Sequence, residues 1–214
     1  MGRRRGQPRV SEPRVFLLSP ANCSGERCQL LLRPGASFEL ARELQSSEGA
    51  PLRDVFEFLS GLYFRGKLAY ADRFARPPTR GSGAWVITAG DGLLSLDERI
   101  RPDDLRRFAE VPIDPRNPLY RLPLERDARV LAKKLGARGE AVLLGSIATA
   151  KYTQVLLGIF AGRLRFPSAF IGRGDMSRGS IMLRCARAGL ELEYLPVPSA
   201  PIHARGPASG LANA

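Results

Sequence analysis

The stretch over residues 141–162 constrains the fold of this chain more than any other. Residues 141–144 (AVLL) form a short, uninterrupted apolar run, as expected of a strand that is buried on both faces. Gly145 and Ser146 interrupt this run, and an apolar stripe at helical spacing follows. The pattern therefore predicts a buried strand, a turn of small residues and a helix that packs against a sheet.

The start of that predicted helix is a candidate anion site. The first N–H groups of a helix have no partner within the helix, and the helix dipole places partial positive charge there. Lys151 and Tyr152 fall in the first turn, where they would contact a bound group. An ordinary strand–helix unit, with a solvated lysine and a packed tyrosine, is the alternative interpretation.

The rest of the chain repeats this alternation of strands and helices. Further strands are predicted at residues 14–19, 29–32, 84–88, 164–166, 169–171 and 190–195. Helices are predicted at residues 36–45, 52–74, 103–108, 124–135 and 181–188, and an extended segment at 111–123. We expect a single three-layer α/β/α domain over residues 14–195 with a mostly parallel sheet. A flexible basic arm (1–13) would precede it, and a disordered tail rich in Pro, Ala and Gly (196–214) would follow.

The charge balance points to a polyanionic partner. The chain has 33 Lys and Arg against 21 Asp and Glu, a net charge of +12. Residues 1–14 contribute five Arg against one Glu, and residues 163–187 contribute six Arg against Asp175. Clustered arginine fits DNA or RNA first and a phosphorylated nucleoside or other small molecule second. A genome that favours arginine codons is the alternative explanation.

The cysteine and histidine content excludes several classes of site. Three cysteines do not suit a disulfide framework and indicate a reducing, cytoplasmic location. Because the only histidine is His203, in the predicted tail, histidine-based triads are excluded, and we expect no metal and no cofactor. No secretory signal is apparent, and Lys151 within the apolar stretch 142–162 argues against a membrane span.

Four loops follow predicted core strands, at residues 19–27, 89–97, 145–152 and 172–179. Because the carboxyl ends of parallel strands meet at one edge of a sheet, we expect these loops to line one pocket. In the last loop, Arg173, Arg178 and Gly179 are candidates for binding phosphate.

Asp91 is the best placed carboxylate. It lies between two glycines directly after the predicted strand 84–88, and Asp97 is a second candidate in the same loop. Turn formation alone also explains Asp91. Tyr63 and Lys67 lie four residues apart and share a helix face. The residues expected to contact a substrate are Ser19, Asn22, Tyr63, Lys67, Gly92, Ser146 and Tyr152.

Five short motifs in order resemble the YaaA-type, or peroxide-stress, family. They are Leu17-Leu18-Ser19-Pro20-Ala21, the segment GLYFRGK at 61–67, Asp91-Gly92-Leu93-Leu94 with Asp97 and Ile100-Arg101-Pro102, Ser146 with Tyr152, and Arg178-Gly179. The chain is similar to a distant member, because Asn22 stands where the family has lysine and Asp103 where it has an aromatic residue. The resemblance implies a three-layer α/β fold with a basic cleft, DNA binding, and kinship to enzymes that handle nucleobases, such as uracil-DNA glycosylases.

Two hypotheses of different classes follow. The first is an enzyme that performs glycosidic or base-exchange chemistry on a nucleobase, nucleoside or nucleic acid. In it Asp91 acts as general base or stabilises positive charge, Asp97 and Lys151 are further catalytic candidates, and a tyrosine stacks on the base. The second is a non-catalytic DNA-binding protein of the stress response. A nucleotide-dependent enzyme of a specialised pathway is a third, weaker alternative.

Overall fold

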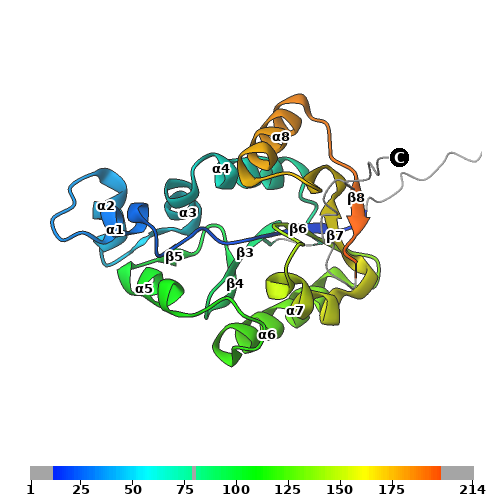
Figure 1. The fold of residues 1–214 in the computed structure, drawn as a ribbon, viewed down its shortest axis with the longest axis horizontal. Helices are drawn as coiled ribbons and strands as arrows, with labels where there is room; N and C mark the ends of the chain where they lie inside the picture. Colours follow the sequence, from blue (N-terminus) through cyan, green and yellow to red (C-terminus); the bar gives the residue numbers. More distant parts are fainter. Residues whose placement is uncertain (1–11, 79–80, 199–214) are drawn as a thin grey trace, which may run out of the picture.

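The apolar runs that predict core strands pair in one sheet between two layers of helices (Figure 1). The computed structural model describes residues 12–78 and 81–198. The strand order is β4-β3-β1-β6-β7-β8, with four parallel strands in the middle and an antiparallel strand at each edge. The strands are β1 (Arg14–Leu18), β3 (Ala84–Thr88), β4 (Gly92–Ser95), β6 (Glu140–Leu144), β7 (Leu164–Pro167) and β8 (Tyr194–Pro196). The predicted α/β class with a mostly parallel sheet is confirmed.

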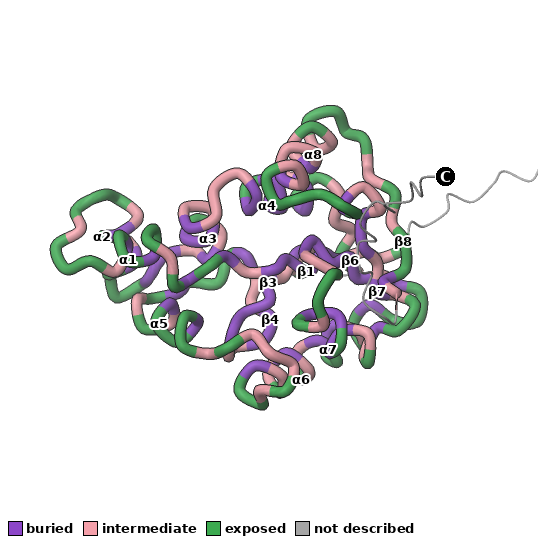
Figure 2. The backbone as a smooth tube through the Cα atoms, in the orientation of Figure 1, coloured by how far each residue is buried: buried purple, intermediate pink, exposed green. Residues whose placement is uncertain are grey.

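Side chains of the central strands β1 and β6 alternate between two cores. Phe16 and Leu144 enter the core that the first helix layer shares, whereas Leu17 and Leu143 enter the core on the opposite face. All four are fully buried, and the strands lie in the buried band of Figure 2. Because both faces are covered, the strands are continuously apolar rather than alternating.

The helices divide between these two cores. The first core contains buried residues of α1 (Glu26–Leu32), α2 (Glu39–Gln45), α3 (Leu52–Ser60), α4 (Leu62–Phe74), α5 (Pro102–Glu110) and α8 (Asp175–Ala188). The second contains those of α6 (Pro118–Leu135) and α7 (Ala150–Phe160). A small ladder joins β2 (Ala50–Pro51) to β5 (Arg99–Ile100), and 3-10 turns at Ala161–Arg163 and Ser168–Phe170 flank β7. Within residues 12–78 and 81–198, none of the helices combines the length and the apolar character that a bilayer span requires.

The structure corrects three predicted elements. The strand predicted at 169–171 is wrong, because residues 169–170 belong to the 3-10 turn Ser168–Phe170 after β7. The strand predicted at 29–32 is wrong, because this segment belongs to α1. There Cys28 and Leu31, three residues apart, are buried, while Leu30 is 48% exposed. The segment predicted to be extended at 111–123 is helical from Pro118, since proline fits the first helical position and the Asn117 side chain accepts a hydrogen bond (3.1 Å) from the backbone N–H of Leu119.

The last predicted strand also differs from the prediction. Only the last part of the strand predicted at 190–195 pairs, as β8, and the order continues past residue 196. Val197 is buried, and its N–H donates to the carbonyl of Leu164 (2.9 Å). Most of the predicted arm and tail, residues 1–11 and 199–214, lies outside the described residues.

Helices α4 and α8 approach so closely that their backbones touch at two glycines. A Cβ atom on Gly66 would lie 2.6 Å from the carbonyl oxygen of Gly179, and one on Gly179 would lie 2.9 Å from that of Leu62. Real Cβ atoms do not approach backbone oxygens this closely. The absence of side chains at Gly66 and Gly179 therefore sets the distance between the two helices.

Substituting Gly66→Ala should destabilise the protein by about 1–3 kcal/mol, because the added methyl group has no space against the α8 backbone. The matched control is Gly158→Ala, a helical position where an added Cβ meets nothing within 4 Å. This control should gain up to about 1 kcal/mol from helix propensity. Urea unfolding of both variants measures the effects, and equal stability of the two would contradict the close approach of α4 and α8.

Candidate functional site

The topological switch point of the sheet lies between β1 and β6, where the chain leaves the sheet in opposite directions. After β1 the chain enters the layer that contains α1 to α4, and after β6 it enters α7 in the other layer. In open α/β sheets such a switch point, at the carboxyl ends of the strands, is the usual place for a ligand. Ser19 follows β1 and Gly145 follows β6, so the two residues lie side by side at this switch point.

Ser19 and Gly145 are in tight contact. The backbone N–H of Ser19 donates to the carbonyl of Leu144 (3.3 Å), as does its hydroxyl (3.4 Å). A Cβ atom on Gly145 would lie 2.9 Å from the Cβ of Ser19. Glycine at 145 therefore leaves the space that the Ser19 side chain occupies.

Lys67 of α4 reaches Ser19 at this switch point from the helix layer that covers one face of the sheet. Its side chain is buried, with 1% exposure, and its Nζ donates to the hydroxyl (2.7 Å) and the carbonyl (2.8 Å) of Ser19. The same Nζ lies 4.0 Å from the ring centroid of Tyr63 and 5.4 Å from that of Phe64. The amine is thus held between a serine and two aromatic rings, away from water.

Burial lowers the pKa of Lys67 to about 7. Removal from water is the main cause, since it disfavours the charged form of an amine. Asp175 acts in the opposite direction and raises the pKa, while Arg178 lowers it. Near neutral pH a large share of the Lys67 amine is therefore unprotonated, the form that accepts a proton or attacks an electrophile.

Tyr63 contributes a hydroxyl that is buried and forms no hydrogen bond of good geometry within the described part of the chain. Burial raises the pKa of Tyr63, the Asp175 charge raises it further, and hydrogen bonding toward Arg178 and Ser19 lowers it. The Tyr63 hydroxyl thus lies near both side chains without bonding well to either. A buried polar atom without a protein partner is uncommon, and a bound water or a ligand atom would satisfy it.

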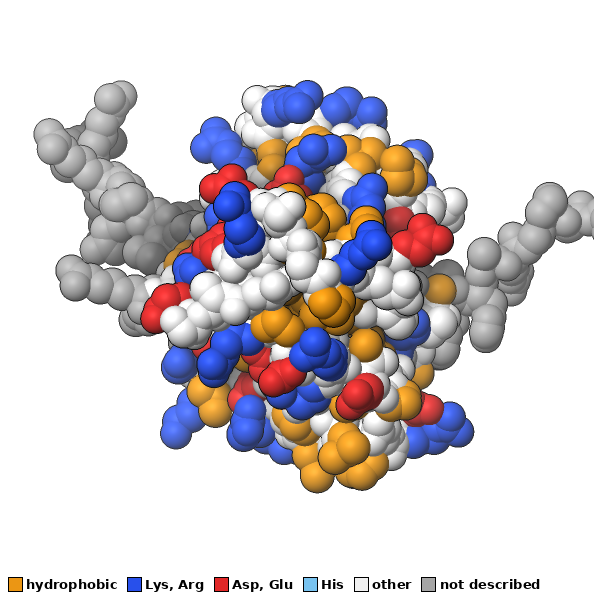
Figure 3. All heavy atoms as spheres, turned by 90° about the vertical axis from the view of Figure 1, so that its left-hand side faces the viewer, with side chains coloured by type: hydrophobic (Ala, Val, Ile, Leu, Met, Phe, Trp, Pro, Cys, Tyr) orange, Lys and Arg blue, Asp and Glu red, His pale blue; other side chains and the backbone are white. Residues whose placement is uncertain are grey.

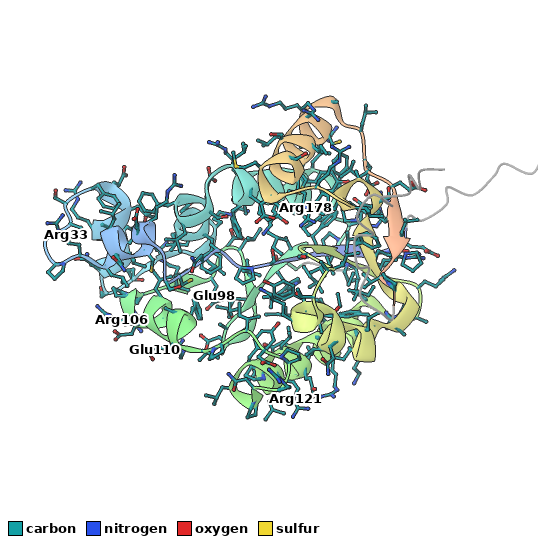
Figure 4. All side chains as sticks on the ribbon, viewed as in Figure 1. Arg33, Glu98, Arg106, Glu110, Arg121 and Arg178 are labelled. Carbon is teal, nitrogen blue, oxygen red and sulfur yellow. The ribbon has the colours of Figure 1, made fainter. Side chains whose placement is uncertain are left out.

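Arg178 and Asp175 come from the first turns of α8. The Arg178 guanidinium donates to the carbonyl of Phe170 (3.2 and 3.3 Å) and lies 3.7 Å from the Asp175 carboxylate. The Arg178 side chain is only 13% exposed, on the side of α8 that faces the sheet (Figure 4). Asp175 is largely exposed at the helix start.

Tyr152 of α7 completes the group from the opposite layer. It is buried, and burial raises its pKa to about 12, with smaller contributions from Tyr63 and Asp175. Asp175 therefore acts electrostatically on Lys67, Tyr63 and Tyr152 alike. We call the following set the Lys67 cluster: Ser19, Tyr63, Lys67, Tyr152, Asp175 and Arg178.

An open hollow of about 1060 Å³ lies over α1, α3 and the starts of α4 and α8, and none of its lining residues belongs to the Lys67 cluster. Leu62 and Met176, which line it, are the chain neighbours of Tyr63 and Asp175. Arginines and carboxylates line this hollow together, among them Arg27, Arg65, Asp54 and Glu57.

Three of the four predicted loops meet at the cluster, and one does not. Loops 19–27, 145–152 and 172–179 contribute to it, although the last is not a free loop because α8 already begins at Asp175. Gly179 does not bind phosphate through an open backbone. It is buried, against the backbone of Leu62 and Tyr63.

Asp91 lies apart from the Lys67 cluster. The segment after β3, predicted as a turn, returns as β4 antiparallel to β3 and carries Asp91 toward α5. There the Asp91 carboxylate accepts two hydrogen bonds (3.0 and 2.5 Å) from Arg107, whose pKa it raises. Asp91 also lines a separate pocket with Trp85 and Asp127.

The remaining predicted residues lie on the surface or serve local structure. Asp97 is 82% exposed and 3.3 Å from Arg53, and the exposed Asn22 accepts hydrogen bonds from Ser24. Gly92 begins β4, and the Ser146 hydroxyl accepts from the N–H of Ala148. The side chains of Lys151 and Arg173 are exposed, and the Lys151 carbonyl accepts from the Tyr120 hydroxyl (2.8 Å).

Asp175 is the member of the Lys67 cluster that the sequence analysis did not include among its candidates. The sequence alone shows Asp175 only as the one negative charge among the six arginines of residues 163–187. A helix-start signal was present, since Gly174 precedes Asp175 and an acidic residue suits the first turn of a helix. Placing the start of the last helix at residue 181 concealed this signal.

Several arginines form ion pairs with carboxylates within the fold. Arg14 and Arg165 both pair with Glu140 (2.9 and 2.8 Å), and Arg14 and Arg76 both pair with Glu191. On the face shown in Figure 3, basic side chains lie among acidic ones and form no continuous basic surface. In the described ranges, no group of three or more His, Cys, Asp or Glu side chains is placed to hold a metal ion.

No protein-family model matches the chain, and no curated protein or solved structure is significantly similar to it. The expected relationship to the YaaA-type family therefore stays a prediction.

The burial of Lys67 should make stability depend on pH. Its pKa is about 7 in the folded protein and near 10.5 in the unfolded chain, so between these values the unfolded chain binds a proton that the folded protein lacks. Stability should therefore rise with pH across this window, by at most about 1.4 kcal/mol per pH unit. Unfolding free energies of the wild type and Lys67→Met, compared at pH 7 and pH 9, should show the wild type gaining about 1–3 kcal/mol on the variant. A pH-independent difference would contradict the buried-amine assignment.

Proposed function

We propose that the Lys67 cluster is the site of an enzyme that acts on a nucleobase or nucleoside, free or within a nucleic acid. The observation that carries the proposal is the buried Lys67 amine, bonded to the Ser19 hydroxyl (2.7 Å) at the switch point of the sheet. Burying an amine costs free energy. Amines whose pKa is strongly shifted by burial are found most often at functional sites.

The aromatic and polar groups of the cluster suit a planar heterocycle. Tyr63 and Tyr152 bring rings from opposite layers, and enzymes that act on bases hold them against such rings. The unpartnered Tyr63 hydroxyl and the Ser19 hydroxyl each donate or accept a hydrogen bond, as the edge of a base requires. Arg178 suits a phosphate or a carbonyl oxygen of the ligand.

The reactive groups suit proton transfer at a glycosidic bond. Unprotonated Lys67 accepts a proton from Ser19 or from the substrate, and its protonated form returns that proton to a departing base. Asp175 takes the role that the sequence suggested for Asp91, because its negative charge favours positive charge that develops on the sugar. Glycosidic or base-exchange chemistry is therefore the reaction class that we propose.

Membership in a distant branch of the YaaA-type family is part of this proposal. Four of the motifs that carry the resemblance supply members of the Lys67 cluster: the first motif supplies Ser19, residues 61–67 supply Tyr63 and Lys67, the fourth supplies Tyr152, and the last supplies Arg178. A non-catalytic DNA-binding role is the competing proposal, and it requires no reactive amine.

Replacing the amine should separate these two roles. Lys67→Met should reduce base release from nucleosides or from DNA oligonucleotides by about 10²-fold or more, the usual effect of losing an acid–base group. The matched control is Lys151→Met, which removes an exposed lysine and should keep full activity. Chromatography of the released base measures turnover, and anisotropy measures DNA binding at low salt. DNA binding by the wild type without base release from any substrate would support the non-catalytic role.

The two aspartates should differ in the same assay. Asp175→Asn should lower turnover by about 10²-fold, while melting changes little because the side chain is exposed. Asp91→Asn should leave turnover unchanged and cost up to about 1 kcal/mol, since it weakens a partly exposed pair with Arg107. Loss of turnover in Asp91→Asn but not in Asp175→Asn would return the catalytic role to Asp91.

A further inference from the structure

Lysine is rare in this chain, and one of its few lysines is Lys67. Of its 33 basic residues other than histidine, only four are lysine: Lys67, Lys133, Lys134 and Lys151. Three of these are exposed, on α6 and at the start of α7, and the fourth is the buried amine of α4. Arginine matches lysine as a cation but does not lose its proton in proteins. Lys67 is therefore the only one of the four lysines that is buried. A buried lysine can lose its proton and become a neutral nucleophile, whereas a buried arginine cannot.

The surroundings of the Lys67 amine suit covalent chemistry at a carbonyl carbon. The Ser19 hydroxyl, 2.7 Å from Nζ, is placed to pass a proton between the amine and an oxygen bound to the same carbon. The Asp175 carboxylate favours the positive charge that an iminium carries. The ring faces of Tyr63 and Phe64 keep water away from the nitrogen.

We propose that Lys67 forms an imine with the C1 aldehyde of a base-free sugar phosphate. The inference rests on the proposed function, because breaking a glycosidic bond leaves a sugar whose ring opens to an aldehyde at C1. The chemical class is an aldehyde sugar that carries phosphate, either free as 2-deoxyribose 5-phosphate or as an abasic site within a DNA strand.

The step balances without an oxidant or reductant. The Nζ lone pair attacks C1, the C=O π bond breaks, and the oxygen takes the Ser19 proton while Nζ returns a proton to Ser19. The resulting carbinolamine loses its hydroxyl group, with a proton, as one molecule of water. One amine and one aldehyde thus give one imine and one water, and hydrolysis reverses the step.

Reductive trapping tests the proposal on the full-length wild-type chain. The protein is incubated with 2-deoxyribose 5-phosphate, or with an oligonucleotide that contains one abasic site, in the presence of sodium cyanoborohydride. Intact mass and peptide mapping should place one adduct on Lys67, with at least about tenfold more label than on Lys133, Lys134 or Lys151. The oligonucleotide arm and the sugar arm together show which source of the aldehyde reacts.

Two variants serve as controls. Lys67→Arg keeps a cation and should lose the adduct, whereas Lys151→Arg should keep it; a melting curve shows that each is folded. Label spread evenly over the four lysines of the wild type, or no label, overturns the proposal whether or not Lys67→Arg folds.

Together, the trapping and base-release experiments distinguish failure of the imine proposal from failure of the proposed glycosidic activity. Base release that depends on Lys67, without a trapped adduct, leaves the proposed function in place and removes the imine. An adduct on Lys67 without base release from any nucleoside or DNA substrate supports the imine and removes the proposed glycosidic activity.

Discussion

The contact between the Lys67 amine and Ser19 is the interaction on which the rest of the site depends. A lysine inside a protein loses its hydration, and the two hydrogen bonds to Ser19 and the ring face of Tyr63 offset only part of that cost. The pKa of Lys67 is lowered because the lost hydration is not fully replaced by these contacts. The same burial that makes the residue unfavourable for stability makes its amine available near neutral pH.

Two close backbone approaches hold that contact in place. Gly145 lets Ser19 lie against the end of β6, and the Gly66–Gly179 pair lets α8 settle on α4. Because α8 lies so close, the side chains of its first turns, Asp175 and Arg178, act on Tyr63 and Lys67. The electrostatics of the cluster thus depend on glycines that carry no functional group themselves.

The path of the chain around the sheet explains why three of the four predicted loops supply residues of the Lys67 cluster and the fourth does not. Parallel strands deliver their following loops to one edge, and Ser19, Tyr152 and the start of α8 meet there for that reason. The segment after β3 forms an antiparallel hairpin instead, so Asp91 points toward α5 and meets Arg107. A turn flanked by glycines is compatible with either course, and only the pairing of β4 with β3 selects between them.

The sequence by itself determined the parallel core and most of the residues of the Lys67 cluster. Doubly buried strands must be apolar throughout, so the runs at 14–19, 84–88 and 141–144 are visible without coordinates. Tyr63 and Lys67 share a face because helical periodicity fixes their spacing. Only the tertiary structure decided that Lys67 is buried against Ser19, that α8 begins at Asp175, and that Asp91 is bound elsewhere. Each of these depends on contacts between segments far apart in the chain, and local periodicity contains no information about such contacts.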